Sequence, residues 1–408
     1  MKRRRTLVED IMGKFSVLFF MVVGLMIASC DTFVDNTLNV SPQEMSTLSF
    51  LTFNADLDAT AVLNYAARLS AIPQAVADTG ADVVCLQGVW KEADQKNQIA
   101  ARLKAVYPYQ FYKITKGGET EPQPAACTQE DLTPMAMCYL SNCSETDTTD
   151  VVAIGLCLAQ NCLTEITGIP TECRDCLIGA ITGGAGDITG IMAECSAEQV
   201  PVEMAQGGNN GLMLLSEFPL VGATLKEFDS FYYKRAYISA KIQHPLFGDI
   251  DIVCTQLTDA IAGMPYEGTL GSWEGELTSQ AQAIIDLAPL KDTGFRVLMG
   301  DLATGPAIGR DIRGKNPSVY DMFYYAYYYD PFVEADNAEP SCTLCAGNPL
   351  TAAETVDQIP SHILFTNWEG LNLSVERVLD EPFTFTEKGK DKSSPYSDHY
   401  GLKAILSR

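Results

Sequence analysis

Basic residues are scarce in this chain of 408 residues. It has 28 lysines and arginines against 52 aspartates and glutamates, which gives a formal net charge of −24. Binding to a polyanion requires clustered lysines and arginines, so the composition argues against a nucleic-acid partner. Apolar residues make up 47% of the sequence and charged residues 20%, which is typical of a folded globular protein. The excess acidity is then best interpreted as a solubilising surface charge.

Histidine is rarer still, because the whole chain has only His244, His362 and His399. Any catalytic or metal-binding histidine must be one of these three. His244 precedes Pro245 in an expected turn between strands, which leaves few alternatives if a histidine is missing from a catalytic position.

The N-terminus lacks an apolar run long enough to cross a membrane. Residues 15–28 are apolar, but a helix of that length does not span a hydrocarbon core of about 30 Å. Residues 2–5 are all basic, and Ile27-Ala28-Ser29 before Cys30 resembles the bacterial lipobox. We predict a lipoprotein signal peptide over 1–29, a polar tether over 30–46, and lipidation of Cys30 that anchors the protein in the bacterial cell envelope, outside the cytoplasm. An ordinary signal peptide or a short anchor is the alternative.

Strands and helices are predicted to alternate on both sides of a cysteine-rich region. In the first helix Leu69, Ile72 and Val76 fall on one face, and Gly80 ends it. The predicted helices span 64–78, 93–105 and 279–287, and the predicted strands span 48–53, 82–86, 109–113, 211–216, 236–243, 250–255, 296–299, 363–365 and 401–405. This order favours a layered α/β sandwich over 47–113 and 207–408.

The 13 cysteines indicate disulfides, because lipidation of Cys30 would leave an even number in an exported chain. Eight of them lie within 114–206, which contains no histidine, so a zinc site there is disfavoured. Two Cys-x4-Cys segments, 138–143 and 157–162, repeat after 19 positions. We predict that 114–206 is an insertion of short helices held by disulfides of unknown pairing. Elsewhere, Cys85 and Cys254 are expected to be buried, unpaired apolar residues, and Cys342 and Cys345 to form a local disulfide.

Six short motifs occur in the order typical of one superfamily. The motifs are Thr52-Phe53-Asn54, residues 79–87, residues 210–216, Lys234-Arg235-Ala236, Gly300-Asp301 and residues 397–401. Together they resemble the endonuclease/exonuclease/phosphatase superfamily, which includes DNase I-like nucleases, sphingomyelinases and inositol-phosphate phosphatases. The resemblance implies a DNase I-like four-layered α/β sandwich.

The resemblance also implies a chemistry for particular positions. In this family a divalent cation such as Mg²⁺ neutralises charge on a phosphodiester, while a histidine–aspartate pair activates the attacking water. Asn54 corresponds to a residue that helps to hold the metal. Asp301, Asp398 and His399 correspond to retained catalytic positions.

Four other positions depart from the family pattern. Gly88 stands where the metal-binding carboxylate is expected, Gln256 where a histidine is expected, and Ala303 where an asparagine is expected. Ser361 stands where an aspartate would orient His399. Loss of one general acid or base typically costs about 10²–10⁴ in rate, so four departures disfavour normal turnover. If only side chains were lost, Gly88→Glu, Gln256→His, Ala303→Asn and Ser361→Asp together would restore metal binding.

These observations predict an exported, lipid-anchored protein that binds an unknown ligand or protein through an impaired phosphodiesterase site and needs no cofactor. The alternative is an active phosphodiesterase that uses Mg²⁺ or another divalent cation in a rebuilt site. Acids near the expected strand ends could then replace the lost ligand: Asp56, Asp58, Glu92 and Asp94. A third possibility is that the insertion carries the function. The aromatic segment 320–332 could either form a ligand-contacting lip or pack against the sheet, and packing is favoured.

Overall fold

The computed structural model describes residues 46–408, apart from 60–61, 118–124, 147–150, 172, 175, 178–187, 197–203, 262, 288–293 and 336–339. The predicted signal peptide, Cys30 and nearly all of the predicted tether lie outside the described residues. Among the helices that the structure does describe, none is both long and apolar enough to cross a membrane.

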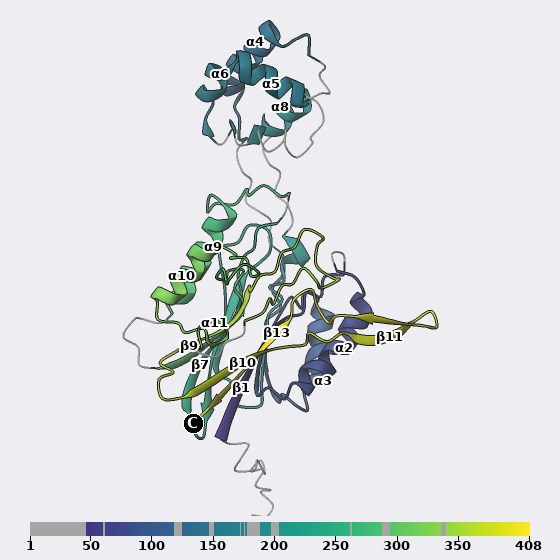
Figure 1. The fold of residues 1–408 in the computed structure, drawn as a ribbon, viewed down its shortest axis with the longest axis vertical. Helices are drawn as coiled ribbons and strands as arrows, with labels where there is room; N and C mark the ends of the chain where they lie inside the picture. Colours follow the sequence, from purple (N-terminus) through teal and green to yellow (C-terminus); the bar gives the residue numbers. More distant parts are fainter. Residues whose placement is uncertain are drawn as a thin grey trace, which may run out of the picture. The chain divides into compact units, whose positions relative to one another are not determined.

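Two β-sheets stack face to face (Figure 1). The first has the order β10 (Asn372–Val378), β13 (Gly401–Ser407), β1 (Thr47–Asn54), β2 (Val83–Gln87), β4 (Met213–Ser216), β3 (Tyr109–Phe111). The second has the order β5 (Val221–Glu227), β6 (Ala236–His244), β7 (Gly248–Gln256), β8 (Phe295–Asp301), β9 (Ser361–Thr366). The parallel strands β1 and β2 end at Asn54 and Gln87, which pair with each other. The parallel strands β7 and β8 end in the same way at Gln256 and Asp301.

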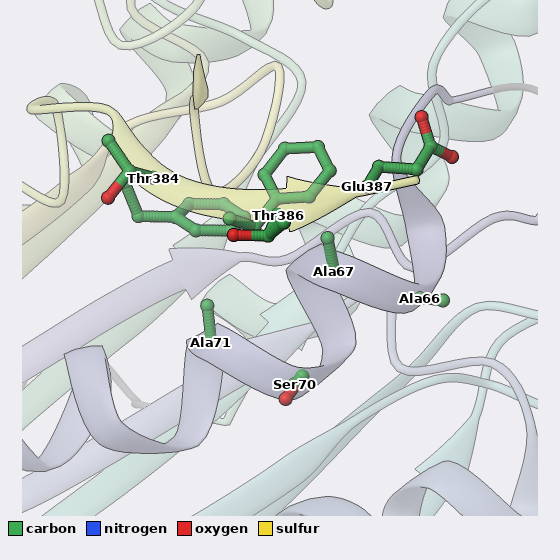
Figure 2. A pocket seen from close by; sticks show the side chains of 9 residues that line it. Ala66, Ala67, Ser70, Ala71, Thr384, Thr386 and Glu387 are labelled. Atoms are coloured by element: carbon green, nitrogen blue, oxygen red, sulfur yellow. The ribbon is translucent and has the colours of Figure 1, made fainter. Parts of the chain in front are cut away.

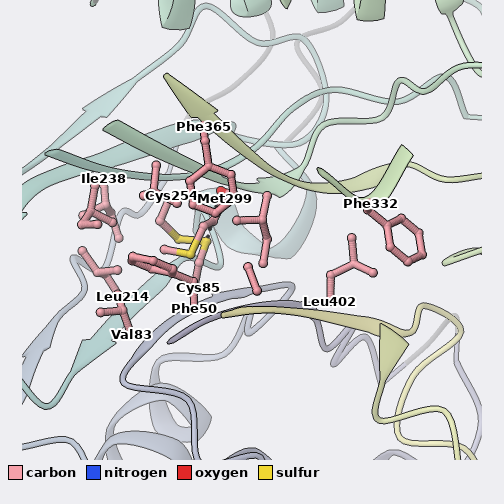
Figure 3. Close-up of a cluster of buried hydrophobic side chains, with 14 of the residues drawn as sticks. Phe50, Val83, Cys85, Leu214, Ile238, Cys254, Met299, Phe332, Phe365 and Leu402 are labelled. Atoms are coloured by element: carbon pink, nitrogen blue, oxygen red, sulfur yellow. Dashed lines mark hydrogen bonds between the residues drawn. A yellow bond between two sulfur atoms is a disulfide. The ribbon is translucent and has the colours of Figure 1, made fainter. Parts of the chain in front are cut away.

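The alternation of side chains along each strand divides the core. On β1, Leu48 and Phe50 join the cluster between the sheets, whereas Leu51 and Phe53 join the cluster on the other face. Cluster residues from both sheets interdigitate around Met299 (Figure 3). Both faces of β1 are therefore buried.

Helices cover the outer face of each sheet. The cluster outside the first sheet includes residues of α2 (Tyr65–Asp78), a π-helix (Asp94–Ala100) and α3 (Ala101–Leu103). The cluster outside the second sheet includes residues of α9 (Trp273–Ile285) and α10 (Pro317–Tyr325). The predicted four-layered α/β sandwich is thus confirmed. The helix predicted over 93–105 is corrected in one respect, because most of it is a π-helix, which side-chain periodicity cannot distinguish from an α-helix.

Cys85 and Cys254 are not unpaired apolar residues, so that prediction was wrong. They form a disulfide with a sequence separation of 169, which links β2 to β7 across the sandwich (Figure 3). Both are fully buried in strands of different sheets. Their strands are far apart in the sequence, so only the stacking of the two sheets reveals that they face each other.

The helices of the insertion whose bounds lie within the described residues include α4 (Gln129–Asn142), α5 (Val151–Asn161), α6 (Leu163–Gly168) and α8 (Ile188–Ser196). The two Cys-x4-Cys segments are joined crosswise, by Cys138–Cys162 and Cys143–Cys157, so the first cysteine of each pairs with the second of the other. Cys127–Cys173 and Cys176–Cys195 complete the set, so the predicted disulfides are confirmed. The chain leaves and returns at one place, because Gly117 N donates to Gly207 O (2.9 Å) beside a 3-10 turn (Ala205–Gly208).

A hairpin of β11 (Phe383–Glu387) and β12 (Lys390–Ser394) was not foreseen, and it pairs with no other strand. A groove of about 430 Å³ lies between this hairpin and α2. Ala67 and Ala71 of α2 point toward the hairpin across the groove (Figure 2). The predicted disulfide Cys342–Cys345 is confirmed.

The aromatic segment 320–332 forms most of α10 and α11 (Pro331–Glu334). Its Tyr320, Phe323, Tyr328 and Phe332 are buried, which confirms the expectation of packing for this half of the segment. Tyr324, Tyr325 and Tyr327 are exposed.

Candidate functional site

The retained residues meet where strands of both sheets end. Asn54 closes β1 in the first sheet, and Asp301 closes β8 in the second. The amide Nδ2 of Asn54 donates to Asp301 Oδ2 at 2.7 Å, which joins the two sheets at this point. Strand register places Gln256, Asp301 and Ser361 side by side on β7, β8 and β9. The ends of four strands therefore share one end of the sandwich with His399, which precedes β13.

The backbone at Gly88 leaves no room for a side chain. Its φ is +69°, a conformation that favours glycine. A Cβ at this position would lie 2.6 Å from Asn54 Oδ1 and 2.7 Å from Asp56 N. The chain after β1 folds over this glycine, since Leu57 N donates to Gly88 O at 2.7 Å. A carboxylate at this position would require the backbone at Asp56 to move. We therefore no longer expect the four side-chain changes alone to restore metal binding.

The residues present do not fit the divalent cation that the family implies. The side chain of Asn54 is engaged at both ends, because its Oδ1 accepts from Asp56 N (3.1 Å) while its Nδ2 bonds Asp301. Within the described parts of the chain, one group of three histidine, cysteine or acidic ligand atoms lies close enough together to hold an ion. That group is Cys342, Cys345 and Asp357, whose cysteines are bonded to each other and cannot ligate. At the strand ends, the described residues therefore bring no three such ligand atoms together.

His399 lies between two acids without a hydrogen bond to either. Its Nδ1 is 3.9 Å from Asp301 Oδ2, and its Nε2 is 3.9 Å from Asp398 Oδ2. Nδ1 is buried and has no hydrogen-bond partner. Burial lowers the pKa of His399, but the charges of Asp398, Asp301 and Asp56 outweigh burial and raise it above its ordinary value. The imidazole of His399 therefore binds a proton more tightly than an ordinary histidine does.

Asp56 is the acid that the structure adds to this group. Burial, followed by the charge of Asp398, raises the pKa of Asp56 from 3.8 to about 7. His399 and Arg68 oppose that rise. A carboxyl group that titrates near neutral pH beside a histidine can exchange protons with it or with a ligand.

The other acids considered as replacement ligands are engaged elsewhere. Asp58 accepts from Gln206 Nε2 at 2.7 Å. Glu92 forms exposed ion pairs with Lys96 and Lys116, each at 2.6 Å. Asp94 accepts a hydrogen bond from Tyr65 at the start of the π-helix. None of these three contacts Asn54 or Asp301 through a hydrogen bond that the described residues show.

Arg68 positions the loops that carry the acids, and no sequence motif pointed to it. It is fully buried, and its Nη2 donates to Ala55 O (2.7 Å) and Asp56 O (2.5 Å). Its Nε donates to Tyr396 O at 3.1 Å, two residues before Asp398. One guanidinium on α2 therefore fixes the backbone before both Leu57 and Asp398.

The remaining departures from the family pattern are buried. Gln256 Oε1 and Ser361 Oγ have no hydrogen-bond partner. Ala303 has a φ of +51°, and its N donates to Asp301 Oδ1 at 3.1 Å. Ser361 thus does not orient His399, and the second-sheet side of the site keeps polar atoms that nothing in the protein satisfies.

Behind Ser361, on the opposite face of β9, His362 forms a buried pair that sequence reasoning missed. Its Nδ1 lies 2.7 Å from Asp330 Oδ2, and its Nε2 lies 2.8 Å from Thr304 O. Burial lowers the pKa of His362, but Asp330 raises it and the net direction is upward. This pair supports the strand end and takes no part in the site itself.

The fold and the position of the site define a DNase I-like α/β sandwich. The model of the Endonuclease/Exonuclease/phosphatase family matches residues 51–302, and the chain belongs to that family. No curated protein matches the chain.

Solved structures share this fold. Sphingomyelinase C from Streptomyces griseocarneus is 15% identical with a TM-score of 0.50, and the match covers 89% of this chain and 99% of that one. Beta toxin from Staphylococcus aureus is 15% identical with a TM-score of 0.51, covering 88% and 99%. A beta toxin mutant, 14% identical with a TM-score of 0.50 and the same coverage, carries bound magnesium ions. At these identities the likeness establishes the fold alone.

Proposed function

We propose that this protein is an exported, lipid-anchored member of the family that binds a ligand at the strand ends and does not hydrolyse it at the rate of an intact enzyme. The anchor would be Cys30, which would hold the protein at a membrane of the bacterial envelope. The formal charge of −24 supports a ligand other than nucleic acid.

The observation that carries this proposal is the closed backbone at Gly88. A substituted side chain alone could be compensated by a nearby acid. Here Asn54 Oδ1 and Asp56 N occupy the space that a Cβ would need, so a new carboxylate at this position requires the main chain to move. The unfilled polar atoms of Gln256 and Ser361 support retention of a binding surface beside it.

A hydrolysis assay tests the proposal. The purified protein is given Mg²⁺ with sphingomyelin or with an activated phosphodiester, beside His399→Ala. We expect no turnover that distinguishes the two proteins. Magnesium-dependent hydrolysis that His399→Ala abolishes would show that binding is not the working role.

A second candidate function is an active phosphodiesterase with a rebuilt site, and the raised pKa of Asp56, about 7, favours it. Asp56 and His399 would then supply general acid and base groups. This candidate predicts a loss of turnover in Asp56→Asn as well as in His399→Ala. Equal, negligible rates in wild type and both variants would exclude it.

Lipid anchoring has its own test. Cys30→Ala should abolish incorporation of a labelled fatty acid and release the protein from the membrane fraction. Labelling that survives the substitution would place the attachment elsewhere.

A further inference from the structure

A buried guanidinium without an ionic partner lies beside the site. Arg235 directly precedes β6, where Ala236 pairs with Gln256 of β7 and Gln256 pairs with Asp301 of β8. The charge of Asp301 acts on the Arg235 guanidinium. The residue is only 6% exposed. Its Nε and Nη1 are buried and have no hydrogen-bond partner. Burying a cation with unsatisfied donors costs folding free energy, so a functional reason for burying Arg235 is expected.

Aromatic rings hold this guanidinium in place. Its central carbon lies 5.0 Å from the ring centroid of Tyr233 and 5.7 Å from that of Trp90. Trp90 is itself fixed, because Asn209 Nδ2 donates to its carbonyl at 2.5 Å and its ring packs against Gly211. Trp90 Nε1 is also buried without a partner. Arginine and tryptophan can only donate, so these neighbours present several orphan donors and no acceptor.

The acids that influence Arg235 are committed to other groups. Burial lowers the pKa of Arg235. The charge of Asp301 opposes this most, and Tyr233, Asp259 and Glu276 oppose it less, in that order. Asp301 is bonded to Asn54 and to Ala303 N. Asp259 pairs with Lys315 at 2.8 Å.

Glu276, the last of these acids, accepts from Phe231 N at 2.9 Å and from Gln280 Nε2 at 3.1 Å. No carboxylate of the described residues forms an ion pair with Arg235. Its donors are therefore left for an anion from outside the chain.

We propose that Arg235 and Trp90 form a metal-independent site for the oxyanion of a phosphate ester, in which the guanidinium supplies the positive charge that a divalent cation would otherwise provide. This inference rests on the proposed binding function and names its ligand class. Arg235 Nε and Nη1 and Trp90 Nε1 give three donors from two side chains. A phosphate can accept from all three, because its acceptor oxygens point in several directions.

The first test measures binding without metal. The full chain, solubilised in detergent with EDTA, is titrated with inorganic phosphate and with phosphocholine by calorimetry, and with sphingomyelin vesicles by flotation. Vesicles of a galactolipid, which carry no phosphate, are the blank. Binding to a soluble phosphate identifies a free ligand, binding to sphingomyelin vesicles alone identifies a headgroup, and either supports the site. No binding to any phosphate probe, or binding that appears only with Mg²⁺, overturns it.

The second test assigns the binding to Arg235. We expect Arg235→Gln to weaken phosphate affinity by about 10–100-fold, because it removes a charge-assisted pair. Arg310→Gln removes the same charge from an exposed position and should leave affinity unchanged. Unaltered affinity in Arg235→Gln would refute the assignment.

A stability measurement separates recognition from a structural role. Replacing a buried unpaired cation by an apolar side chain of similar size is often neutral or stabilising. We therefore expect Arg235→Met to keep or raise the Tm of the ligand-free protein while it abolishes the rise in Tm that phosphate produces. A clear fall in Tm of the ligand-free protein would show that Arg235 serves the fold.

The two proposals can fail separately. If the protein hydrolyses phosphodiesters but Arg235→Gln still loses phosphate affinity in EDTA, the proposed function fails and the site at Arg235 stands. If no hydrolysis occurs and phosphate does not bind without metal, the site at Arg235 fails and a different ligand is implied.

Discussion

The two halves of the site have diverged to different extents. In the first-sheet half, formed by Asn54, Asp56 and Gly88, the main chain has closed and the polar atoms of Asn54 are satisfied within the protein. In the second-sheet half, formed by Arg235, Gln256 and Ser361, buried polar atoms remain without partners. Buried polar groups in folded proteins are normally hydrogen-bonded, so unsatisfied ones indicate function more strongly than satisfied ones do.

This difference shows why the loss of a motif residue cannot be judged from its side chain alone. At Gly88 the neighbouring backbone fills the space that a side chain would need, and a substitution must displace it. At Ser361 and Gln256 the strand register is intact, and a reversion changes only the side chain. The family side chains are therefore harder to restore in the first-sheet half than in the second-sheet half.

The largest effect is expected from removing the covalent link between the two sheets that carry the two halves of the site. Cys85→Ala with Cys254→Ala removes the only disulfide that the described residues place between the sheets, and should cost about 3–5 kcal/mol of unfolding free energy because a long loop is released. Urea denaturation measures this. Cys342→Ala with Cys345→Ala opens a loop with a sequence separation of 3, and should cost about 2 kcal/mol or less. Equal losses would show that the link between the sheets has no special weight.

A smaller effect, confined to the first-sheet half, comes from Gly88→Ala. The substitution combines a strained φ with backbone contacts under 3 Å, so we expect a loss of about 2–4 kcal/mol in unfolding free energy. Gly80→Ala is the matched control, because φ is +60° there but nothing lies within 4 Å, and it should cost about 1 kcal/mol. If both variants lose the same amount, the space around Gly88 is open and the comparison of the two halves fails.

The next effect depends on pH. Burial raises the pKa of Asp56 to about 7 in the folded state, whereas the ordinary value, expected in the unfolded chain, is 3.8. The folded state therefore binds this proton more tightly, and the stability it contributes is complete below about 3.8 and is lost as pH rises through 7. His399, whose pKa is also raised, adds a loss of the same sign above about 6.5.

Urea denaturation across this range in Asp56→Asn should show a flatter decline than in wild type or in Asp311→Asn, which changes an exposed acid. A decline identical in all three proteins would mean that Asp56 is not the titrating group.

The smallest effect is expected from removing the insertion. Since Gly117 N and Gly207 O are 2.9 Å apart, replacement of 118–206 by two glycines should leave a sandwich that unfolds cooperatively with nearly unchanged stability. The shorter loop should also reduce the contribution of Cys85–Cys254. Loss of cooperative unfolding would show that the insertion is part of the fold.

Much of the architecture could be predicted from the sequence. The strands that carry motifs were located to within a few residues, because period-two alternation and terminal polar residues are local signals. The hairpin β11–β12 was missed, although Phe383 and Phe385 alternate with threonines on β11, because that strand is short and β12 is polar and mostly exposed. The disulfide Cys85–Cys254 was missed because it depends on how two sheets stack.

The site was predictable only where it coincides with motifs. Asn54, Asp301 and His399 were found in this way, and the structure brings them together. Arg68 lies in no motif, and Arg235 lies in a motif to which the sequence assigned no role; their importance comes from burial and from atoms without partners. The closure at Gly88 depends on a backbone dihedral and on a contact with Asp56, which no residue pattern records.

Calorimetric titration of the purified protein with Mg²⁺ tests the central claim most directly. The account predicts no saturable binding at millimolar Mg²⁺, in wild type or in the variant that combines Gly88→Glu, Gln256→His, Ala303→Asn and Ser361→Asp. Saturable binding by wild type that Asp301→Asn abolishes would contradict it, because the strand ends would then hold the cation despite the backbone that fills the space at Gly88.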